Sequence, residues 1–288
     1  MQGLVAGASG RIGRPVARLL IERGHRVRAG VRDVVSQAAA QLGGAVVRAD
    51  FDDPASLEAA ARDVDVVVAT GTAHRAGPDG ERRHGIALAE ALARAGGPAL
   101  VYVSGAGADR PSGVPVFEAK RAVEQRIAEL GLAAAILAPA YFMENALNPW
   151  NLEALAHGRF PLALPADQPL AQVAIHDVAA MAVVAVERFD QLAGQRIELA
   201  SDELTGEQAA ERLSRATGRR FVFERVPAPP PLRALFAWLD DVGFAIDLPA
   251  LHARYPEVRW RSFEAWARSR SAVSAWPQCP AQPSGVLS

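Results

Sequence analysis

Apolar and polar positions alternate in blocks along the first half of the chain. Short apolar runs predict strands near residues 3–8, 25–32, 45–51, 64–70, 99–106 and 132–139. Between them, apolar residues recur at helical spacing and predict helices near residues 11–24, 53–63 and 81–97, and a further helix that contains Lys120. Strands that alternate with helices form a parallel sheet covered on both faces. We therefore expect an α/β fold, a Rossmann-type doubly wound parallel sheet.

The alternation becomes irregular after residue 140. Residues 176–188 predict a helix capped by Asp177, and residues 194–200 predict a late strand of the same sheet. Thr205 and Gln208 have the spacing of a capping box for the helix that follows them. The sheet is therefore expected to take one more strand from the second half of the chain.

The organisation of the second half predicts a smaller companion to the sheet. Residues 221–226 predict another short strand. The proline-rich run at residues 227–231 then predicts a stiff connector, and helical patterns follow it. We expect a dinucleotide-binding domain over residues 1–140, with the late strand added to it, and a mostly helical subdomain on the substrate side over residues 141–288. The tail from about residue 277 to 288 is expected to be disordered.

Composition excludes several classes of protein. The 288 residues are 50% hydrophobic, and 31 basic against 32 acidic residues give a net charge of −1, which argues against nucleic-acid binding. Cys279 has no second cysteine with which to form a disulfide, which favours a reducing, cytoplasmic location. The opening residues "MQGLVAGASGR" lack the features of a signal peptide, and the run "LAAAILAPAYF" is too short to cross a membrane.

A glycine-rich loop joins the first predicted strand to the first predicted helix. Small residues there permit a tight turn, close approach of a pyrophosphate to the backbone, and close packing of helix on strand. The helix that follows presents free N–H groups and the positive end of its dipole to the phosphates. We expect this loop to bind a dinucleotide through Gly7, Ser9, Gly10, Arg11, Ile12 and Gly13.

The end of the second predicted strand favours NADPH over NADH. An NAD-binding protein usually has an acid there for the ribose hydroxyls, whereas this chain has Arg32, with Asp33 one residue later. Arg32 and Arg11 could flank a 2′-phosphate, for which a planar guanidinium is well suited. The alternative is that both are ordinary surface arginines. Further residues expected at the cofactor are Asp50, Phe51, Thr70 and Gly71.

Four segments resemble one known family. The runs "GASGRIGRPVARLLIERGHRVRAGVRD", "RADFDDPASLEAAARDVDVVV", "APAYFMENAL" and "GQRIELASDELTGEQAAERLSRATGR" are similar to the NmrA-like group of atypical short-chain dehydrogenases/reductases. The similarity covers roughly residues 3–226. It implies an NAD(P)-binding Rossmann fold, shared by NADPH-dependent quinone- and isoflavone-type reductases and by catalytically silent NAD(P)-sensing regulators.

The resemblance assigns candidate catalytic residues and shows one departure. The standard short-chain enzyme uses a serine, a tyrosine acid, and a lysine four residues after the tyrosine. Ser104 and Lys120 match the serine and the lysine, but Val116 stands in the position of the tyrosine. The usual phenol acid is therefore missing.

Lys120 is the single lysine of the chain, since every other basic side chain is arginine. Burial can bring an ammonium toward neutrality, whereas a guanidinium keeps its proton, so Lys120 is the first candidate for proton donor. Tyr141, Ser104 and water are the alternatives. Lys120 could also hold only the ribose hydroxyls of the cofactor, or be an exposed helix residue beside Arg121.

Residues beyond the sixth predicted strand are candidates for the substrate pocket. Ligands of open α/β sheets bind outside the carboxyl ends of the strands. The candidates are Tyr141, Phe142, Met143, Asn145 and Trp150, which could equally pack the domain. His74 and His84 could reach the cofactor, His176 is expected to be structural, and no cluster has the spacing of metal ligands, so we expect no metal.

These features favour an enzyme. The expected function is an NADPH-dependent reductase of a small apolar carbonyl, quinone or conjugated substrate, without a nucleic-acid or membrane partner. The alternative is an NADP(H)-binding sensor that acts through a protein partner. A sugar-nucleotide epimerase is a poor fit because it depends on the absent tyrosine. The sequence leaves open the substrate, the proton donor, and whether the chain forms a homodimer.

Overall fold

The structure is a computed structural model that describes residues 1–269, and it divides into two compact units. Unit 1 comprises Met1–Ala140, Ile175–Leu199 and Ile246–Trp260, and unit 2 comprises Tyr141–Ala174, Ala200–Ala245 and the chain from Arg261 onward. The domains expected at residues 1–140 and 141–288 stay a prediction, because compactness does not show that either part folds separately. The tail expected to be disordered and Cys279 lie outside the described residues.

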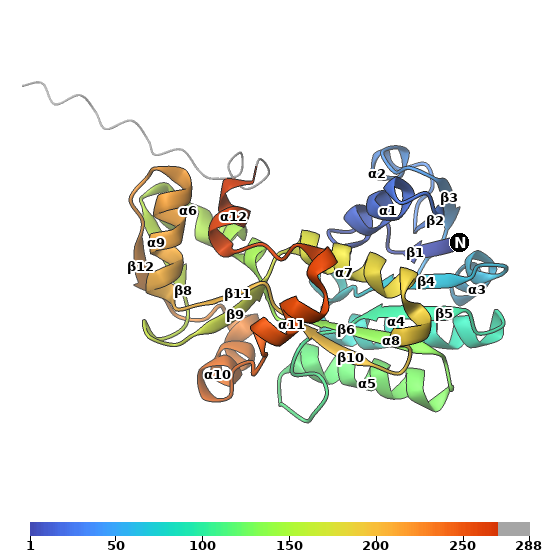
Figure 1. Ribbon diagram of the computed structural model, residues 1–288. Helices are drawn as coiled ribbons and strands as arrows, with labels where there is room; N and C mark the ends of the chain where they lie inside the picture. The colour runs from blue at the N-terminus through green and yellow to red at the C-terminus, as the bar shows by residue number, and fades with distance from the viewer. Residues whose placement is uncertain (270–288) are drawn as a thin grey trace, which may run out of the picture. The chain divides into compact units, whose positions relative to one another are not determined.

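Unit 1 contains a seven-stranded parallel sheet, which confirms the expected fold class (Figure 1). The strand order is β3, β2, β1, β4, β5, β6, β10. The first three strands therefore extend the sheet to one side of β1, and the later strands extend it to the other side. The late strand predicted near residues 194–200 pairs with β6 at the sheet edge. The strands are β1 (Gln2–Ala6), β2 (Arg26–Val31), β3 (Ala45–Arg48), β4 (Val66–Thr70), β5 (Ala99–Val103), β6 (Ala134–Pro139) and β10 (Arg196–Leu199).

Helices cover both faces of this sheet (Figure 1). One layer pairs α1 with α7, and the other places α4 between α3 and α5. All five residues of β4 are buried, as expected for a strand covered on both faces. The helices of unit 1 are α1 (Gly13–Glu22), α2 (Gln37–Ala40), α3 (Pro54–Ala61), α4 (Ala73–Arg94), α5 (Pro115–Glu129), α7 (Ile175–Glu187), α8 (Phe189–Leu192), α11 (Leu248–Arg254) and the 3-10 turn η4 (Pro256–Val258).

Two helix starts differ from the sequence analysis. Helix α4 begins at Ala73 rather than near residue 81, because a first turn precedes a kink at Gly77, whose φ is +68°, and Pro78. Proline inside a helix removes a backbone donor and kinks the helix. The helical sequence pattern is therefore interrupted at Pro78, although the helix only bends there. Asp177 was predicted to cap α7, but it lies inside the first turn of that helix.

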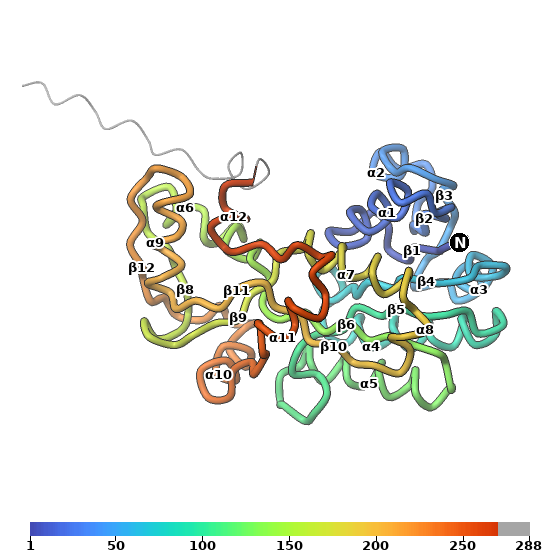
Figure 2. The backbone as a smooth tube through the Cα atoms, viewed as in Figure 1, coloured from blue at the N-terminus to red at the C-terminus, as the bar shows by residue number. Residues whose placement is uncertain are grey.

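Unit 2 is helical but also contains two small sheets, of which the sequence predicted one strand, β12, within residues 221–226. Strand β9 lies between β7 and β11. Strand β12 pairs with β8, and Figure 2 labels both in the same part of unit 2. The predicted capping box of Thr205 and Gln208 is present at the start of α9. The elements are β7 (Tyr141–Phe142), η1 (Met143–Leu147), η2 (Pro149–Asn151), α6 (Leu152–Ala156), β8 (Arg159–Leu162), β9 (Leu170–Val173), β11 (Asp202–Leu204), α9 (Gly206–Thr217), β12 (Val222–Arg225), η3 (Pro230–Leu232), α10 (Arg233–Asp241) and α12 (Phe263–Arg268).

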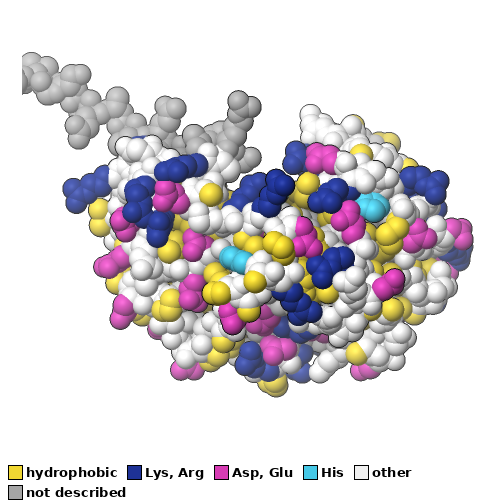
Figure 3. Space-filling model, in the orientation of Figure 1, with side chains coloured by type: hydrophobic (Ala, Val, Ile, Leu, Met, Phe, Trp, Pro, Cys, Tyr) yellow, Lys and Arg dark blue, Asp and Glu magenta, His cyan; other side chains and the backbone are white. Residues whose placement is uncertain are grey.

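Charge is mixed on the face of the molecule that Figure 3 draws. On the face drawn in Figure 3, basic and acidic side chains are interspersed over each unit. This distribution matches the net charge of −1. Within residues 1–269, no helix combines the length and the apolar character needed to cross a bilayer.

Candidate functional site

The glycine loop between β1 and α1 has the geometry that its sequence predicts. Gly7 has a φ of +81°, and a side chain there would come within 2.8 Å of the Thr70 hydroxyl. A Cβ on Gly13 would overlap the Gly7 carbonyl. Helix α1 then begins after Ile12 without a side-chain cap. The amide of Arg14 donates to the carbonyl of Gly10 and Pro15 has no N–H, so the amides of Ile12 and Gly13 are the ones left for another acceptor. The loop therefore offers a close approach to backbone donors, as an anion-binding turn requires.

Other predicted cofactor residues lie at the same edge of the sheet. Arg32 follows β2 directly and is exposed, and the Phe51 ring follows β3 and lies 3.8 Å from a Cβ built on Gly7. Thr70 ends β4 and donates its hydroxyl to the carbonyl of Ala6. The carboxyl ends of parallel strands meet at one edge, which is why these separate segments converge. The loop residues Ser9, Gly10 and Arg11 are exposed there, Ile12 and Asp50 are half-buried, and Gly71 is exposed after β4.

Lys120 does not extend into solvent from α5. Its ammonium lies 2.8 Å from Oε1 of Glu81, which is 1% exposed, and 3.3 Å from the carbonyl of Val103 at the end of β5. The other oxygen of Glu81 accepts the backbone N–H groups of Thr72 and Ala73. Sequence reasoning missed Glu81. The signal available to it was that a buried lysine needs a counter-ion, but nothing in the sequence indicated which acid supplies it.

Glu81 is ionised at neutral pH. Burial raises the pKa of its carboxyl, but the charge of Lys120, the hydrogen bond from Lys120 and the two backbone amides together bring the pKa below its usual range. A buried carboxylate favours the charged form of an ammonium that faces it. The sequence analysis considered only the effect of burial on Lys120. The structure adds a buried counter-ion, which acts in the opposite direction.

Ser104 is buried at the end of β5, and its hydroxyl donates to Glu124 of α5. The second oxygen of Glu124 lies 3.1 Å from Nε of Arg196, and Arg196 also donates to the carbonyl of Gly105. A serine has a single proton to donate. The hydroxyl of Ser104 therefore donates its proton to Glu124 in this structure and can only accept a hydrogen bond from another group.

The position of the absent phenol is occupied by Val116 in the first turn of α5. A different tyrosine, Tyr102 of β5, has its hydroxyl 3.4 Å from Glu81, and the Lys120 ammonium lies 5.7 Å from the centre of its ring. Burial and then the charges of Glu81 and Glu124 raise the pKa of Tyr102 well above its usual range. Tyr102 is therefore a neutral phenol beside the ion pair, and sequence reasoning missed it as well.

The loop before α5 is held by a single carboxylate. Glu118 accepts the backbone N–H groups of Ser112 and Gly113 and pairs with Arg121 at 2.7 Å. The amide of Ser112 first, and then Arg121, lower the pKa of Glu118 from 4.5 to about 2. The depressed pKa means that this carboxylate stabilises the fold above pH 4.5 and loses that effect as the pH falls toward 2.

We therefore expect Glu118→Gln to lower the free energy of unfolding by about 1 kcal/mol at neutral pH, after allowance for solvent screening. The difference from the wild type should shrink between pH 4.5 and 2. Urea denaturation at a series of pH values measures it. Glu22→Gln is the matched control, because Glu22 pairs with Arg18 on the exposed face of α1. A Glu118→Gln deficit that stays constant with pH would contradict this role.

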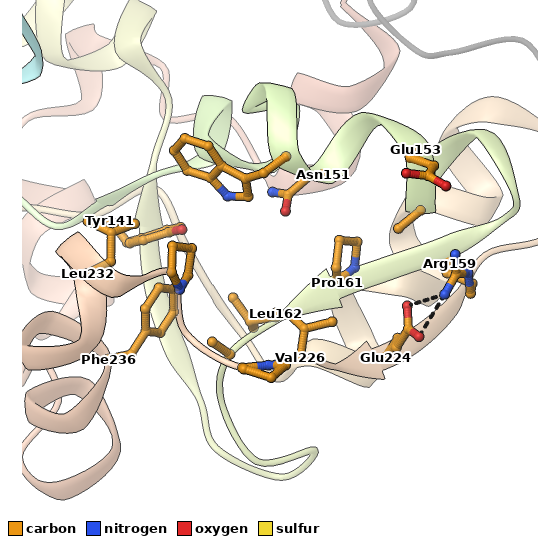
Figure 4. Close-up of a pocket in the computed structure, with 15 residues that line it drawn as sticks. Tyr141, Asn151, Glu153, Arg159, Pro161, Leu162, Glu224, Val226, Leu232 and Phe236 are labelled. Atoms are coloured by element: carbon orange, nitrogen blue, oxygen red, sulfur yellow. Dashed lines mark hydrogen bonds and ion pairs between the residues drawn. The ribbon is translucent and has the colours of Figure 1, made fainter.

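Unit 2 contains a pocket of about 380 Å³. Tyr141 and Phe236, whose ring centres are 6.1 Å apart, lie at one end, and the ion pair of Arg159 with Glu224 lies at the other (Figure 4). Between them the wall is mixed, with Asn151 and Glu153 among apolar side chains. The lining residues are Tyr141, Trp150, Asn151, Glu153, Ala154, Arg159, Pro161, Leu162, Ala163, Glu224, Val226, Pro227, Pro229, Leu232 and Phe236.

Two of the predicted substrate residues, Tyr141 and Trp150, line this pocket. Burial raises the pKa of Tyr141 above its usual range, and a hydrogen bond with Asn145 acts in the opposite direction. Tyr141 is therefore a neutral phenol, with Asn145 as its neighbour. Phe142 is half-buried, and Met143 is fully buried with no exposed surface for a ligand to contact.

Three histidines were singled out in the sequence, and each has a different environment in the structure. His84 is buried, with Nδ1 2.9 Å from the Thr72 hydroxyl and Nε2 3.0 Å from Asp52. His74 is exposed in the first turn of α4, and Nδ1 of His176 lies 3.5 Å from Asp177. Among the described residues, no group of three or more His, Cys, Asp or Glu side chains could hold a metal ion.

Comparisons with known proteins agree with this fold. The chain is 32% identical over 235 residues to (4-alkanoyl-5-oxo-2,5-dihydrofuran-3-yl)methyl phosphate reductase of Streptomyces griseus subsp. griseus, a match that covers 81% of this chain and 80% of that protein. NmrA, a negative transcriptional regulator solved in complex with NADP, superposes with a TM-score of 0.76 at 20% identity over 95% of this chain and 96% of that chain. Triphenylmethane reductase of Citrobacter sp. superposes with a TM-score of 0.78 at 19% identity over 95% and 100% of the two chains.

At these identities the two solved structures establish the fold alone. One of them is a reductase and the other is a regulator, so the shared fold does not choose between these functions. Family membership rests on the sequence itself. The profile of the NmrA-like family matches residues 3–250, which is most of the chain. The resemblance seen in the sequence is thereby confirmed, and this chain belongs to the NmrA-like family.

Proposed function

We propose that this chain is an NADPH-dependent reductase of a small, largely apolar carbonyl, quinone or conjugated substrate. The observation that carries the proposal is the position of Lys120, the single lysine, at the carboxyl edge of the sheet that also holds the glycine loop. A cationic donor at that edge can orient a bound cofactor or polarise an oxygen that is being reduced. The reductase of Streptomyces griseus supports the assignment, since it is similar over most of both chains.

The residues of unit 1 suit NADPH. The backbone of the Gly7–Gly13 loop and the uncapped start of α1 would hold the pyrophosphate, and Arg32 would face a 2′-phosphate. When bound, the cofactor supplies the hydride. The carbonyl oxygen that gains charge needs a cation or a proton nearby, and Lys120 provides an N–H for it. Within unit 2, the pocket lined by Tyr141 and Trp150 is the candidate site for the substrate, and its aromatic end suits a flat ring.

A sensor of NADP(H) that acts through a protein partner is the second candidate. Two observations favour it: α5 has Val116 where a phenol acid would be, and the proton of Ser104 is committed to Glu124. The regulator NmrA, solved with NADP, has the same fold. Such a sensor would bind the dinucleotide through the same loop and would catalyse no turnover.

Calorimetric titrations with NADPH, NADP⁺ and NADH test the cofactor assignment first. We expect tight binding of NADPH and weak binding of NADH, and no binding by any of the three would overturn the proposal. A screen of quinones, enones and small ketones for loss of nicotinamide absorbance then separates the two candidates. Turnover of one class supports the reductase, whereas tight binding of NADPH without turnover of any compound favours the sensor.

A further inference from the structure

We propose that Glu81 is the positioning residue of this site: its carboxylate is the counter-ion of Lys120 and holds the ammonium in place at the end of β5. The sequence analysis gave Glu81 no role. That the ammonium serves a bound cofactor or substrate rests on the proposed function. The positioning itself is a property of unit 1. It can therefore be tested without any substrate.

The carboxylate of Glu81 joins three elements. Its Oε1 faces Lys120 of α5 at 2.8 Å and the hydroxyl of Tyr102 of β5 at 3.4 Å. Its Oε2 accepts the amides of Thr72 and Ala73, which open the first turn of α4 directly after β4. A single buried acid thus fixes the lysine relative to the turn that follows β4.

The kink in α4 permits this arrangement. Gly77 and Pro78 separate the first turn of the helix from its main part, so Glu81 can reach back to the amides of residues 72 and 73. The space around the pair is tight. A Cβ on Gly71 would overlap the carboxylate and come within 2.8 Å of the Lys120 ammonium. The absence of a side chain at residue 71 therefore keeps room for the ion pair.

Other charged groups near Lys120 have different partners. Glu124 lies one turn further along α5, but it accepts from Ser104 and pairs with Arg196. Tyr102 is a neutral phenol, since its pKa is raised well above the usual range. His84, one turn along α4 from Glu81, is engaged with Thr72 and Asp52. Glu81 is therefore the carboxylate that balances the charge of Lys120.

The geometry also leaves Lys120 a donor for a ligand. An ammonium has three N–H groups. Glu81 and the carbonyl of Val103 are its acceptors among the described residues, and the side chain retains 12% exposure. One N–H thus stays available for an oxygen of a cofactor or substrate. Because the other two are anchored, its direction is fixed before the ligand binds, which lowers the cost of orientation.

The single lysine makes a direct test practical. Protein labelled with ¹⁵N-lysine gives one side-chain ammonium signal, that of Lys120, which can be followed through an alkaline titration without substrate. In Glu81→Gln, which removes the counter-ion and keeps the shape, we expect the titration to move to lower pH by at least about one unit. The matched control is Glu90→Gln, which breaks the pair of Glu90 with Arg126 further along α4 and should leave the signal of Lys120 unchanged.

Glu81→Asp covers the case in which Glu81→Gln does not fold. It keeps the charge but draws the carboxylate back by one methylene, so we expect a titration between those of the wild type and a chain without the counter-ion. If Lys120 titrates in the folded Glu81 variants as it does in the wild type, the proposal is wrong.

Steady-state kinetics then test whether the Lys120 ammonium takes part in turnover. In Glu81→Gln we expect kcat to fall by about 10- to 100-fold, with the affinity for NADPH close to that of the wild type and partial rescue in Glu81→Asp. A fall in NADPH affinity with unchanged kcat would show that Glu81 acts on cofactor binding rather than through the position of Lys120. If no substrate is ever found, the NMR titration still decides whether Glu81 controls Lys120, so failure of the proposed function and failure of this inference remain distinguishable.

Discussion

Lys120→Met is expected to abolish turnover and also to destabilise the protein. The loss of a preorganised cationic donor should reduce kcat by about 100- to 1,000-fold. Because Glu81 is 1% exposed, removal of its partner leaves an uncompensated buried carboxylate, which costs about 3–5 kcal/mol of the free energy of unfolding. Steady-state kinetics and urea denaturation measure the two effects. Arg121→Met is the matched control, since its neighbouring pair with Glu118 is partly exposed and contributes at most about 1 kcal/mol.

The destabilisation by Lys120→Met should depend on pH. In the wild type the pKa of Glu81 is lowered, so the ion pair stabilises the fold at neutral pH and loses this effect in acid. In the variant, burial without the ammonium raises the pKa of Glu81, and the carboxyl takes up a proton at higher pH than in the wild type. The deficit should therefore be largest at neutral pH and shrink in acid. A deficit that does not change with pH would show that packing, not the ion pair, is lost.

Lys120→Arg separates the charge from the shape of the donor. Arginine keeps the positive charge, so the fold should lose less stability than in Lys120→Met. The guanidinium is larger, however, and a Cβ on Gly105 would already lie 3.3 Å from Cδ of Lys120, which shows how little room the site has. We expect turnover to fall nearly as far as in Lys120→Met, because the donor is displaced. Turnover equal to that of the wild type would rule out a catalytic role for Lys120.

The sheet of unit 1 could be predicted because its strands carry their own signal. Strands such as β4 are buried on both faces and appear as continuous apolar runs between helical patterns. In unit 2 only β12 gave such a signal, and the other strands of the small sheets did not. Strands β7 and β11 have two and three residues, too few for an alternation of apolar and polar positions to show. The first turn of α4 was missed for a local reason, since Gly77 and Pro78 normally end a helix.

The candidate site also has a part that could be predicted from the sequence and a part that could not. The glycine loop could be predicted because its requirement is local, within seven residues between a strand and a helix. The partners of Lys120 and Ser104 could not be predicted. Glu81 lies 39 residues from Lys120 along the chain, and Glu124 lies 20 residues from Ser104. Such pairs exist only once α4, α5 and β5 pack together, and the chain contains many other acids that could have taken the same place.

Gly13→Ala is expected to abolish useful binding of the dinucleotide. A methyl group on Gly13 would overlap the Gly7 carbonyl, and neither atom belongs to a flexible side chain that could move aside. The turn must therefore shift, and the amides at the start of α1 turn away from the position of the phosphates. The loss of two hydrogen bonds to a charged group, at about 1.5 kcal/mol each, raises the Kd for NADPH by about 100-fold.

Gly3→Ala is the matched control for this glycine variant. Gly3 lies in β1, and a Cβ there would make an ordinary contact of 3.5 Å with Val66, so the strand and the loop beyond it should be undisturbed. Calorimetric titration with NADPH on both variants, together with their thermal unfolding, separates binding from folding. Weak binding by a folded Gly13→Ala and normal binding by Gly3→Ala is the expected result. Normal binding by Gly13→Ala would mean that the dinucleotide does not use this turn, and the assignments of Arg32 and Lys120 as cofactor contacts would then lose their common basis.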